Sequence, residues 1–343
     1  MLIGAHVRGG GALTDRLVRG VELGADAIQV FTQSPRAWKP TQYAPDVLAA
    51  YRAAAHAHPT VRATYCHATY LINLATPDDT LYSRSVECLI NNLSVARGMA
   101  ASGLVLHIGS HKGTGTEGAI ARVAEGLRRA LDEANDPDDA AAPACPILLE
   151  NAAGAGGTVG RTLEELEAVI VATDEDERLG VCIDTQHLWA SGVDYSSVAL
   201  ADAVIDEVRT RFGLERLGCM HLNDSKVERG SNRDRHENLG DGTIGAAGLA
   251  SLVGHPDLAT TAALLEVPGE GDGPRSVDVD AARAILEEGS AMRSSQRPSA
   301  GAAKAAKPAR SATSAKAAKP ARSPKAAKDP SATTKRRAPK KGA

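Results

Sequence analysis

The sequence contains few cysteines, very few aromatic residues and no long apolar run. Its five cysteines are scattered and never form a CxxC pair, which argues against disulfides and against a thiolate metal site. No apolar stretch approaches the roughly 18 residues that a membrane span needs. Residues 1–10 also lack the basic and apolar regions of a secretory signal peptide. We therefore expect a cytoplasmic protein with no membrane partner.

Positive charge is concentrated at the C-terminus. From Arg293 onward there are 15 Lys and Arg and a single acid, so this region carries +14 while the rest of the chain carries −17. It consists mostly of Ala, Lys, Pro and Ser, and AAKPARS occurs at 305–311 and again at 317–323. Frequent prolines and the lack of residues to bury predict disorder. We expect a folded domain at 1–290 and a disordered basic tail at 291–343 that binds DNA non-specifically; the alternative is an incidental, solubilising extension.

Short apolar runs alternate with longer amphipathic segments along the first 290 residues. Expected strands lie at 2–6, 26–31, 61–66, 104–107, 146–150, 180–184, 217–221 and 261–266. Expected helices fill the gaps, for example at 45–57, 80–101, 117–133 and 162–173. Eight strand–helix units over this length predict an α/β fold, a (β/α)8 TIM barrel. A doubly wound open sheet is the alternative, but no GxGxxG motif follows the first strand.

Side chains of the metal-ligand type stand at the ends of seven of the eight expected strands. They are His6, His67, His107, Glu150, Asp184, His221 and Glu266. In a barrel these strand ends converge on one face, where active sites are built. Imidazoles and carboxylates packed in a cleft need a compensating positive charge, which metal ions supply. The pattern predicts a metal cluster; His6 fits equally well as a member or as a structural residue.

Two further segments enlarge this cluster. Asp184 begins the sequence DTQH, which places His187 in the loop just beyond its strand. The loop after the seventh strand contains RDRH, where an extended backbone can point Asp234 and His236 the same way. These three loop residues, His187, Asp234 and His236, can form a site of their own. Imidazole and carboxylate ligands without cysteine suit zinc or manganese, with open positions for water and substrate.

The sequence resembles the endonuclease IV family over about residues 1–288. The matching stretches are GAHV at 4–7, HATYLINL at 67–74, HIGSH at 107–111, LLENAAGAG at 148–156, CIDTQH at 182–187, GCMHLNDSK at 218–226, RDRHENLGDGTIG at 233–245 and LLE at 264–266. All nine metal-ligand positions of that family have a matching residue type here. The chain departs from the family at Ala37, Ala68, Ile108 and Ala152, and none of these changes removes a ligand.

The resemblance implies three zinc ions per chain, with manganese as an alternative at one site. The ligand sets it implies are His67, His107 and Glu150 for the first zinc, Glu150, Asp184, His221 and Glu266 for the second, and His187, Asp234 and His236 for the third. Glu150, shared by two metals, is the expected catalytic residue. Arg36, Tyr70 and Leu71 are the expected DNA-binding residues, which bend the duplex and fill the gap left by a flipped nucleotide.

The function that the resemblance implies is base excision repair of double-stranded DNA containing abasic sites. The enzyme would hydrolyse the phosphodiester bond 5′ to the abasic site, leaving a 3′-hydroxyl and a 5′-deoxyribose phosphate, and would remove 3′-blocking groups. Metal ions suit this reaction because they activate water and neutralise phosphoryl oxygens. We expect a monomer associated with the nucleoid. The alternative is a metal-dependent sugar isomerase or epimerase on the same barrel, which needs fewer metals.

Overall fold

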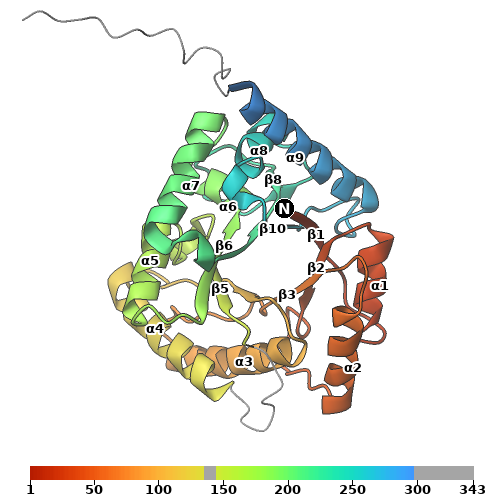
Figure 1. Cartoon of the computed structure of the whole chain (residues 1–343). Helices are drawn as coiled ribbons and strands as arrows, with labels where there is room; N and C mark the ends of the chain where they lie inside the picture. The colour runs from red at the N-terminus through yellow and green to blue at the C-terminus, as the bar shows by residue number, and fades with distance from the viewer. Residues whose placement is uncertain (135–143, 297–343) are drawn as a thin grey trace, which may run out of the picture. The chain divides into compact units, whose positions relative to one another are not determined.

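Eight parallel strands close into a barrel surrounded by helices (Figure 1). The structure is a computed structural model that describes residues 1–134 and 144–296. The barrel strands are β1 Leu2–His6, β2 Ala27–Phe31, β3 Ala63–His67, β4 Leu104–Leu106, β5 Ile147–Glu150, β6 Leu179–Asp184, β7 Leu217–His221 and β10 Ala262–Leu265. Because β1 pairs with both β2 and β10, the sheet has no free edge. The predicted (β/α)8 TIM barrel is confirmed.

Helices follow the strands, as the alternating pattern predicts. The α-helices are α1 Asp15–Glu22, α2 Pro45–His56, α3 Asp79–Gly98, α4 Thr116–Glu133, α5 Leu163–Ala172, α6 Thr185–Ser191, α7 Val198–Phe212, α8 Gly245–Val253 and α9 Ser276–Gln296. Short 3-10 helices span Ala155–Gly157, Leu214–Arg216 and Pro256–Leu258. Over the described ranges, no helix has both the length and the apolar character to cross a membrane.

The strand positions agree with the prediction to within two residues at either end. β4 ends at Leu106 and β10 at Leu265, so His107 and Glu266 are the first residues beyond their strands rather than the last residues within them. β3 extends to His67, which pairs in register with Phe31 of β2. These small shifts leave every expected ligand at the same end of the barrel.

A small apolar cluster fills the barrel interior beside the strand ends that carry the ligands. Leu148 is buried there together with Cys182 and Cys219. A Cβ atom on Gly218 would lie 2.5 Å from the Leu148 Cδ2 atom, so glycine is needed where this leucine fills the barrel. All five cysteines are free and buried, as predicted. The core therefore relies on aliphatic packing and needs few aromatic residues.

Helix α9 continues six residues beyond the boundary expected at residue 290. Arg293, which we assigned to the tail, anchors this extension: its guanidinium pairs with Asp202 and donates to the Ser251 carbonyl oxygen at 2.7 Å. The apolar pattern stops before the helix does, because the last turns of α9 are held by polar contacts with residues far away in the sequence. The remainder of the expected disordered tail, 297–343, lies outside the described residues.

A candidate metal centre at the mouth of the barrel

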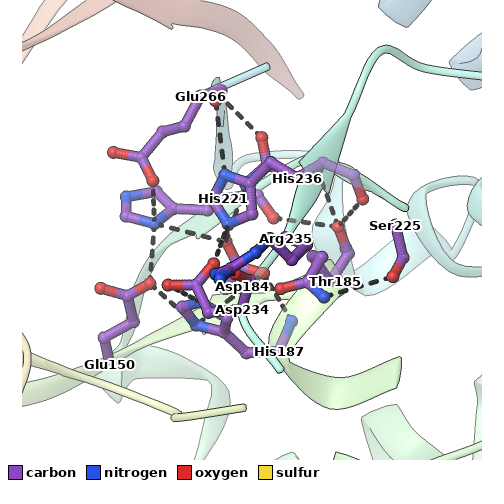
Figure 2. Close-up of polar contacts among 12 residues, drawn as sticks. Glu150, Asp184, Thr185, His187, His221, Ser225, Asp234, Arg235, His236 and Glu266 are labelled. Atoms are coloured by element: carbon purple, nitrogen blue, oxygen red, sulfur yellow. Dashed lines mark hydrogen bonds and ion pairs between the residues drawn. The ribbon is translucent and has the colours of Figure 1, made fainter. Parts of the chain in front are cut away.

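The nine predicted ligands lie together at the carboxyl end of the barrel, and Figure 2 shows most of them pointing toward one another. They are His67 at the end of β3, His107 after β4, Glu150 at the end of β5, Asp184 at the end of β6, His187 on α6, His221 at the end of β7, Asp234 in the following loop, His236 on β9 and Glu266 after β10. β9 (His236–Glu237) pairs with β8 (Asp224–Ser225) in a small antiparallel ribbon outside the barrel. The ribbon folds the loop back so that His236 faces the strand ends.

The first group of ligand atoms surrounds Glu150. Its Oε2 atom lies 3.5 Å from His67 Nε2 and 3.3 Å from His107 Nε2. The Glu150 and His67 side chains are almost completely buried, whereas the side chain of His107 is 30% exposed. This group is therefore open to solvent on the side of His107.

The second group surrounds His221. The Nδ1 atom of this fully buried histidine lies 3.1 Å from Glu150 Oε1, 3.3 Å from Glu266 Oε2 and 3.7 Å from Asp184 Oδ2. Glu150 thus offers one oxygen to each of the first two groups. Three carboxylates facing one imidazole nitrogen form a site for a cation.

The third group includes both loop residues of RDRH. Asp234 Oδ2 lies 3.4 Å from His187 Nε2, and Asp234 Oδ1 lies 3.4 Å from His236 Nε2. Asp184 also approaches this group, with Oδ2 3.6 Å from His236 Nε2. A single oxygen of Asp184 lies within reach of both histidines, so Asp184 can serve the third group as well as the second.

His187 lies on helix α6 and not in a loop, so this part of the prediction was wrong. Asp184 is the N-cap of α6, and its Oδ1 atom accepts a hydrogen bond of 2.7 Å from the His187 backbone N–H. The spacing Asp-x-x-His that suggested two ligands is therefore also a helix start. The cap fixes the Asp184 side chain relative to the first turn of α6, which carries His187.

Several ligand atoms in the cluster have no hydrogen-bond partner within the described ranges. They are His67 Nε2, Glu150 Oε2, His187 Nε2 and His236 Nε2, all buried. Leaving a buried polar atom unpaired costs about 1–3 kcal/mol. Two ligand atoms bound to one tetrahedral zinc ion at about 2.0–2.1 Å lie about 3.4 Å apart. The separations across the three groups, 3.1–3.7 Å, lie around this spacing.

Backbone carbonyl groups orient two of the imidazole rings. His67 Nδ1 donates to the Ala68 carbonyl oxygen at 2.7 Å, and His187 Nδ1 donates to the Asn151 carbonyl oxygen at 2.8 Å. Each ring therefore carries a proton on Nδ1 and directs its Nε2 atom into the cluster. Such partners are typical of metal-binding histidines.

The charged groups of the cluster shift one another's pKa values. Burial acts against the Glu150 carboxylate, but His107 and His221 outweigh burial and hold the pKa of Glu150 well below its usual range. Burial also acts against a charged His221, yet Glu266 and Glu150 raise the pKa of His221 to about 10. The carboxylates thus remain ionised, which is the form that binds metal, whereas His221 holds two protons without a metal ion and releases the one on Nδ1 when a metal binds.

Sequence reasoning missed two buried residues that connect these ligands. Asn223 Nδ2 donates to Asp184 Oδ2 at 2.7 Å, and Asn223 Oδ1 accepts from the Glu266 backbone N–H at 2.9 Å. Asp224 accepts backbone N–H groups from the loop that carries Asp234 and His236. Both residues stand in the matched stretch GCMHLNDSK, which was the only signal available for them.

The expected DNA-binding residues lie on loops beside the cluster. Arg36 is exposed, Tyr70 is 51% exposed and Leu71 is half-buried. The Tyr70 ring lies 5.4 Å from His67 and 6.1 Å from His107, and its backbone N–H donates to the Pro35 carbonyl oxygen. The two loops are therefore tied together at the edge of the cluster.

Known proteins resemble this chain over most of its length. Residues 18–293 match the family described as a xylose isomerase-like TIM barrel. The chain is 35% identical over 268 residues to the "Probable endonuclease 4" of Methanoculleus marisnigri, covering 78% of this chain and 93% of that protein. It is 34% identical over 286 residues to the protein of the same name in Thermosipho africanus, covering 83% and 98%.

Solved structures agree with these sequence relatives. The crystal structure of endonuclease IV from Thermus thermophilus superposes with a TM-score of 0.71 at 32% identity, covering 84% of this chain and all of that chain. A D-tagatose 3-epimerase-like protein superposes with a TM-score of 0.61 at 17% identity, covering 86% and 99%. The second likeness shows the fold alone.

Proposed function

The chain belongs to the endonuclease IV family, and from this premise we propose that it cuts double-stranded DNA at abasic sites. The reaction is hydrolysis of the phosphodiester bond 5′ to the abasic site, which leaves a 3′-hydroxyl and a 5′-deoxyribose phosphate. Removal of 3′-blocking groups is a second activity of the same site. The observation that carries the proposal is the convergence of nine ligand side chains, four of which have a buried ligand atom without a hydrogen-bond partner among the described residues.

We assign three zinc ions to the cluster, with manganese as an alternative at one of them. The ligand sets are His67, His107 and Glu150 for the first ion, Glu150, Asp184, His221 and Glu266 for the second, and His187, Asp234 and His236 for the third. When bound, such ions lower the pKa of water and neutralise charge on phosphoryl oxygens. Glu150 is the proposed catalytic residue because its two oxygens face two different groups.

The protein's own residues hold this arrangement and exclude bulk water from part of it. Asn223 joins Asp184 to the backbone of Glu266, so two ligands from the strands on either side of β7 are held relative to each other. Glu150 and His221 are fully buried, whereas His107 and Asp234 are partly exposed. The phosphodiester would therefore approach from the side of His107 and Asp234.

Binding of DNA depends on local positive charge, because the folded part of the chain is acidic. Arg36 and Lys112 have no acidic partner within the described ranges, whereas Arg8 pairs with Asp272 at 2.7 Å. We propose that Arg36, Tyr70 and Leu71 enter the duplex, since wedging side chains favour extrusion of a nucleotide. The proposal also places the protein with DNA in the cytoplasm, on the nucleoid, as a monomer.

The basic tail supplies additional non-specific affinity for DNA in this proposal. Residues 297–343 contain 14 Lys and Arg and one Asp. Neutralising several phosphates makes binding depend steeply on salt, with a slope of about −0.9 per contact. A chain ending at Gln296, which keeps Arg293 in α9, should therefore bind undamaged duplex with a flatter salt dependence. An unchanged slope would show that the tail does not contribute to DNA binding.

A sugar isomerase or epimerase on the same barrel is the competing function. Epimerase-like structures share the fold at low identity, and fold alone does not assign activity. The third ligand group, which contains His187, Asp234 and His236, favours the nuclease because sugar-converting barrels need fewer metals.

The test is incision of a duplex oligonucleotide that contains one abasic site, with metal content counted on the same samples. Wild type should cut 5′ to the site, leave a 3′-hydroxyl that a polymerase extends, and contain about three metals per chain. Glu150→Gln should lose incision and retain fewer metals. Glu177→Gln, an exposed change just before β6 at the opposite end of the barrel, is the matched control and should behave as wild type. If wild type contains its metals but does not cut the DNA, the sugar isomerase or epimerase function replaces the nuclease.

A further inference from the structure

A buried glutamine in the barrel wall contacts the metal cluster but is not one of its ligands. Gln29 lies in the middle of β2, and none of its surface is exposed. Its amide reaches three ligand-type side chains: His221 Nε2 lies 2.9 Å from Gln29 Oε1, while Glu266 Oε1 and His6 Nδ1 lie 2.7 and 3.1 Å from Gln29 Nε2. A polar side chain buried in a barrel strand is costly unless its hydrogen bonds are made.

The chemistry of the partners fixes the orientation of this amide. The Glu266 carboxylate can only accept, so the group that faces it must be the amide nitrogen of Gln29. The amide oxygen then faces His221 Nε2, which must carry a proton in order to donate. The second amide N–H faces His6 Nδ1 at 3.1 Å, closer than the Glu266 Oε1 atom at 3.4 Å, so we assign His6 Nδ1 as its acceptor. One side chain thus determines the tautomers of two histidines.

These tautomers have consequences for both rings. With its Nε2 proton held by Gln29, His221 directs Nδ1 to the oxygens of Glu150, Asp184 and Glu266, so Nδ1 is the nitrogen that a metal ion binds once it displaces the proton there. With Nδ1 accepting, neutral His6 carries its proton on Nε2. The His6 side chain is 13% exposed and lines a cavity of about 390 Å³ together with Tyr70 and Glu266. This places an N–H donor of His6 beside the substrate-side cavity.

We propose that Gln29 is a positioning residue that fixes the tautomers of His221 and His6, so that His221 binds the second metal through Nδ1 and His6 offers its Nε2–H to the substrate. The proposal rests on the metal-dependent function proposed above. It also answers the question that the sequence left open, because it makes His6 a member of the site that does not bind metal.

The direct test reads the tautomers by long-range ¹H–¹⁵N NMR of the zinc-loaded protein labelled at histidine. The signals of His6 and His221 are assigned by their loss in His6→Asn and His221→Asn. In wild type, His6 should be the neutral tautomer protonated at Nε2. In Gln29→Met, which has a similar length but no N–H group, the Glu266 Oε1 atom at 3.4 Å becomes the nearest polar partner of His6 Nδ1, so the proton of His6 should move to Nδ1. Protonation of His6 at Nδ1 in wild type, or an unchanged His6 in Gln29→Met, overturns the proposal.

Metal affinity gives a second readout that does not use activity. In Gln29→Leu, which fills a similar volume without polar atoms, retention of one metal in a graded chelator series should fall about 10–100-fold, the usual effect of losing a partner of a metal ligand. Thr32→Val is the matched control: Thr32 directly follows β2, is buried and donates to Asn92 Oδ1 at 2.6 Å, away from the ligands. It should lower stability and leave metal retention unchanged.

The outcomes separate this inference from the function on which it rests. A wild type that binds no metal and cuts no DNA defeats the proposed function. A wild type that binds three metals, with Gln29→Leu retaining all of them as tightly and unfolding at a lower temperature, limits Gln29 to packing and overturns the inference alone. If Gln29→Leu fails to fold, the tautomer of His6 in Gln29→Met decides.

Discussion

Replacing Asp224 should unfold the loop that carries Asp234 and His236, two ligands of the third group. This carboxylate is completely buried and has no cationic partner in the structure's described part. It accepts backbone N–H groups from Ser225 at 2.7 Å, Gly240 at 3.0 Å and Ile244 at 3.0 Å, and further ones from Gly242 and Gly245. The loop contains little apolar packing of its own, so these hydrogen bonds hold it against the barrel.

The magnitude follows from the donors that Asp224→Asn would leave unpaired. Asparagine keeps one acceptor oxygen, which still serves Ser225 and Ile244, but it turns an NH₂ group toward the N–H groups of Gly240 and Gly242. Orphaned buried donors cost about 1–3 kcal/mol each, and some of these lie near solvent, so we expect a loss of roughly 2–4 kcal/mol. Water cannot easily fill the gap, because Gly242 packs so closely that a Cβ atom on it would lie 2.4 Å from Asp224 Oδ1.

The assay is urea unfolding together with metal counting, on Asp224→Asn and on the exposed neighbour Asp241→Asn as control. The first variant should lose stability and one metal, the ion assigned to His187, Asp234 and His236, and the control should lose neither. Asp224→Asn with wild-type stability and three metals would refute the reasoning, since the loop would then be held by something other than this carboxylate.

Two further predictions concern the mouth of the barrel. Removing the metals with a chelator should lower the unfolding temperature of wild type by several degrees, because ligands that bind only the folded state stabilise it; an unchanged temperature in differential scanning calorimetry would mean that no metal is lost or that none binds. Asp272→Asn should tighten DNA binding and steepen its salt dependence by about one phosphate contact, because it frees Arg8, whereas stability should change by less than about 1 kcal/mol because both partners are exposed. Fluorescence anisotropy across a salt series checks the second prediction against Glu177→Gln, and equal slopes for the two variants would contradict it.

Much of the site could be predicted because strand ends in a barrel converge whatever the details of packing. His67, Glu150, Asp184 and His221 stand at the ends of their strands, so an apolar run followed by a ligand-type residue locates each of them. The periodicity of the chain places the strands to within two residues because each is a short buried segment between polar helices. These predictions need only local sequence and the geometry of the fold.

The features that were missed depend on contacts between residues far apart in the chain. Nothing in the sequence AIQVF shows that Gln29 meets His221, because their separation is 192 residues. The pairing of Arg8 with Asp272 joins residues 264 positions apart. His187 was misplaced for a different reason: a helix of seven residues is too short to show an amphipathic period.

Charge links the metal centre to the tail. The ligands include four carboxylates, Glu150, Asp184, Asp234 and Glu266, so the mouth of the barrel would repel a phosphodiester unless cations were present. Two divalent ions would only neutralise these carboxylates, whereas three would leave the cluster at about +2 and attract the phosphate locally. The surrounding surface remains acidic, and its field is screened beyond about 8–10 Å at physiological salt. Capture of DNA from a distance therefore requires a separate source of positive charge, and in this chain only residues 297–343 carry enough of it.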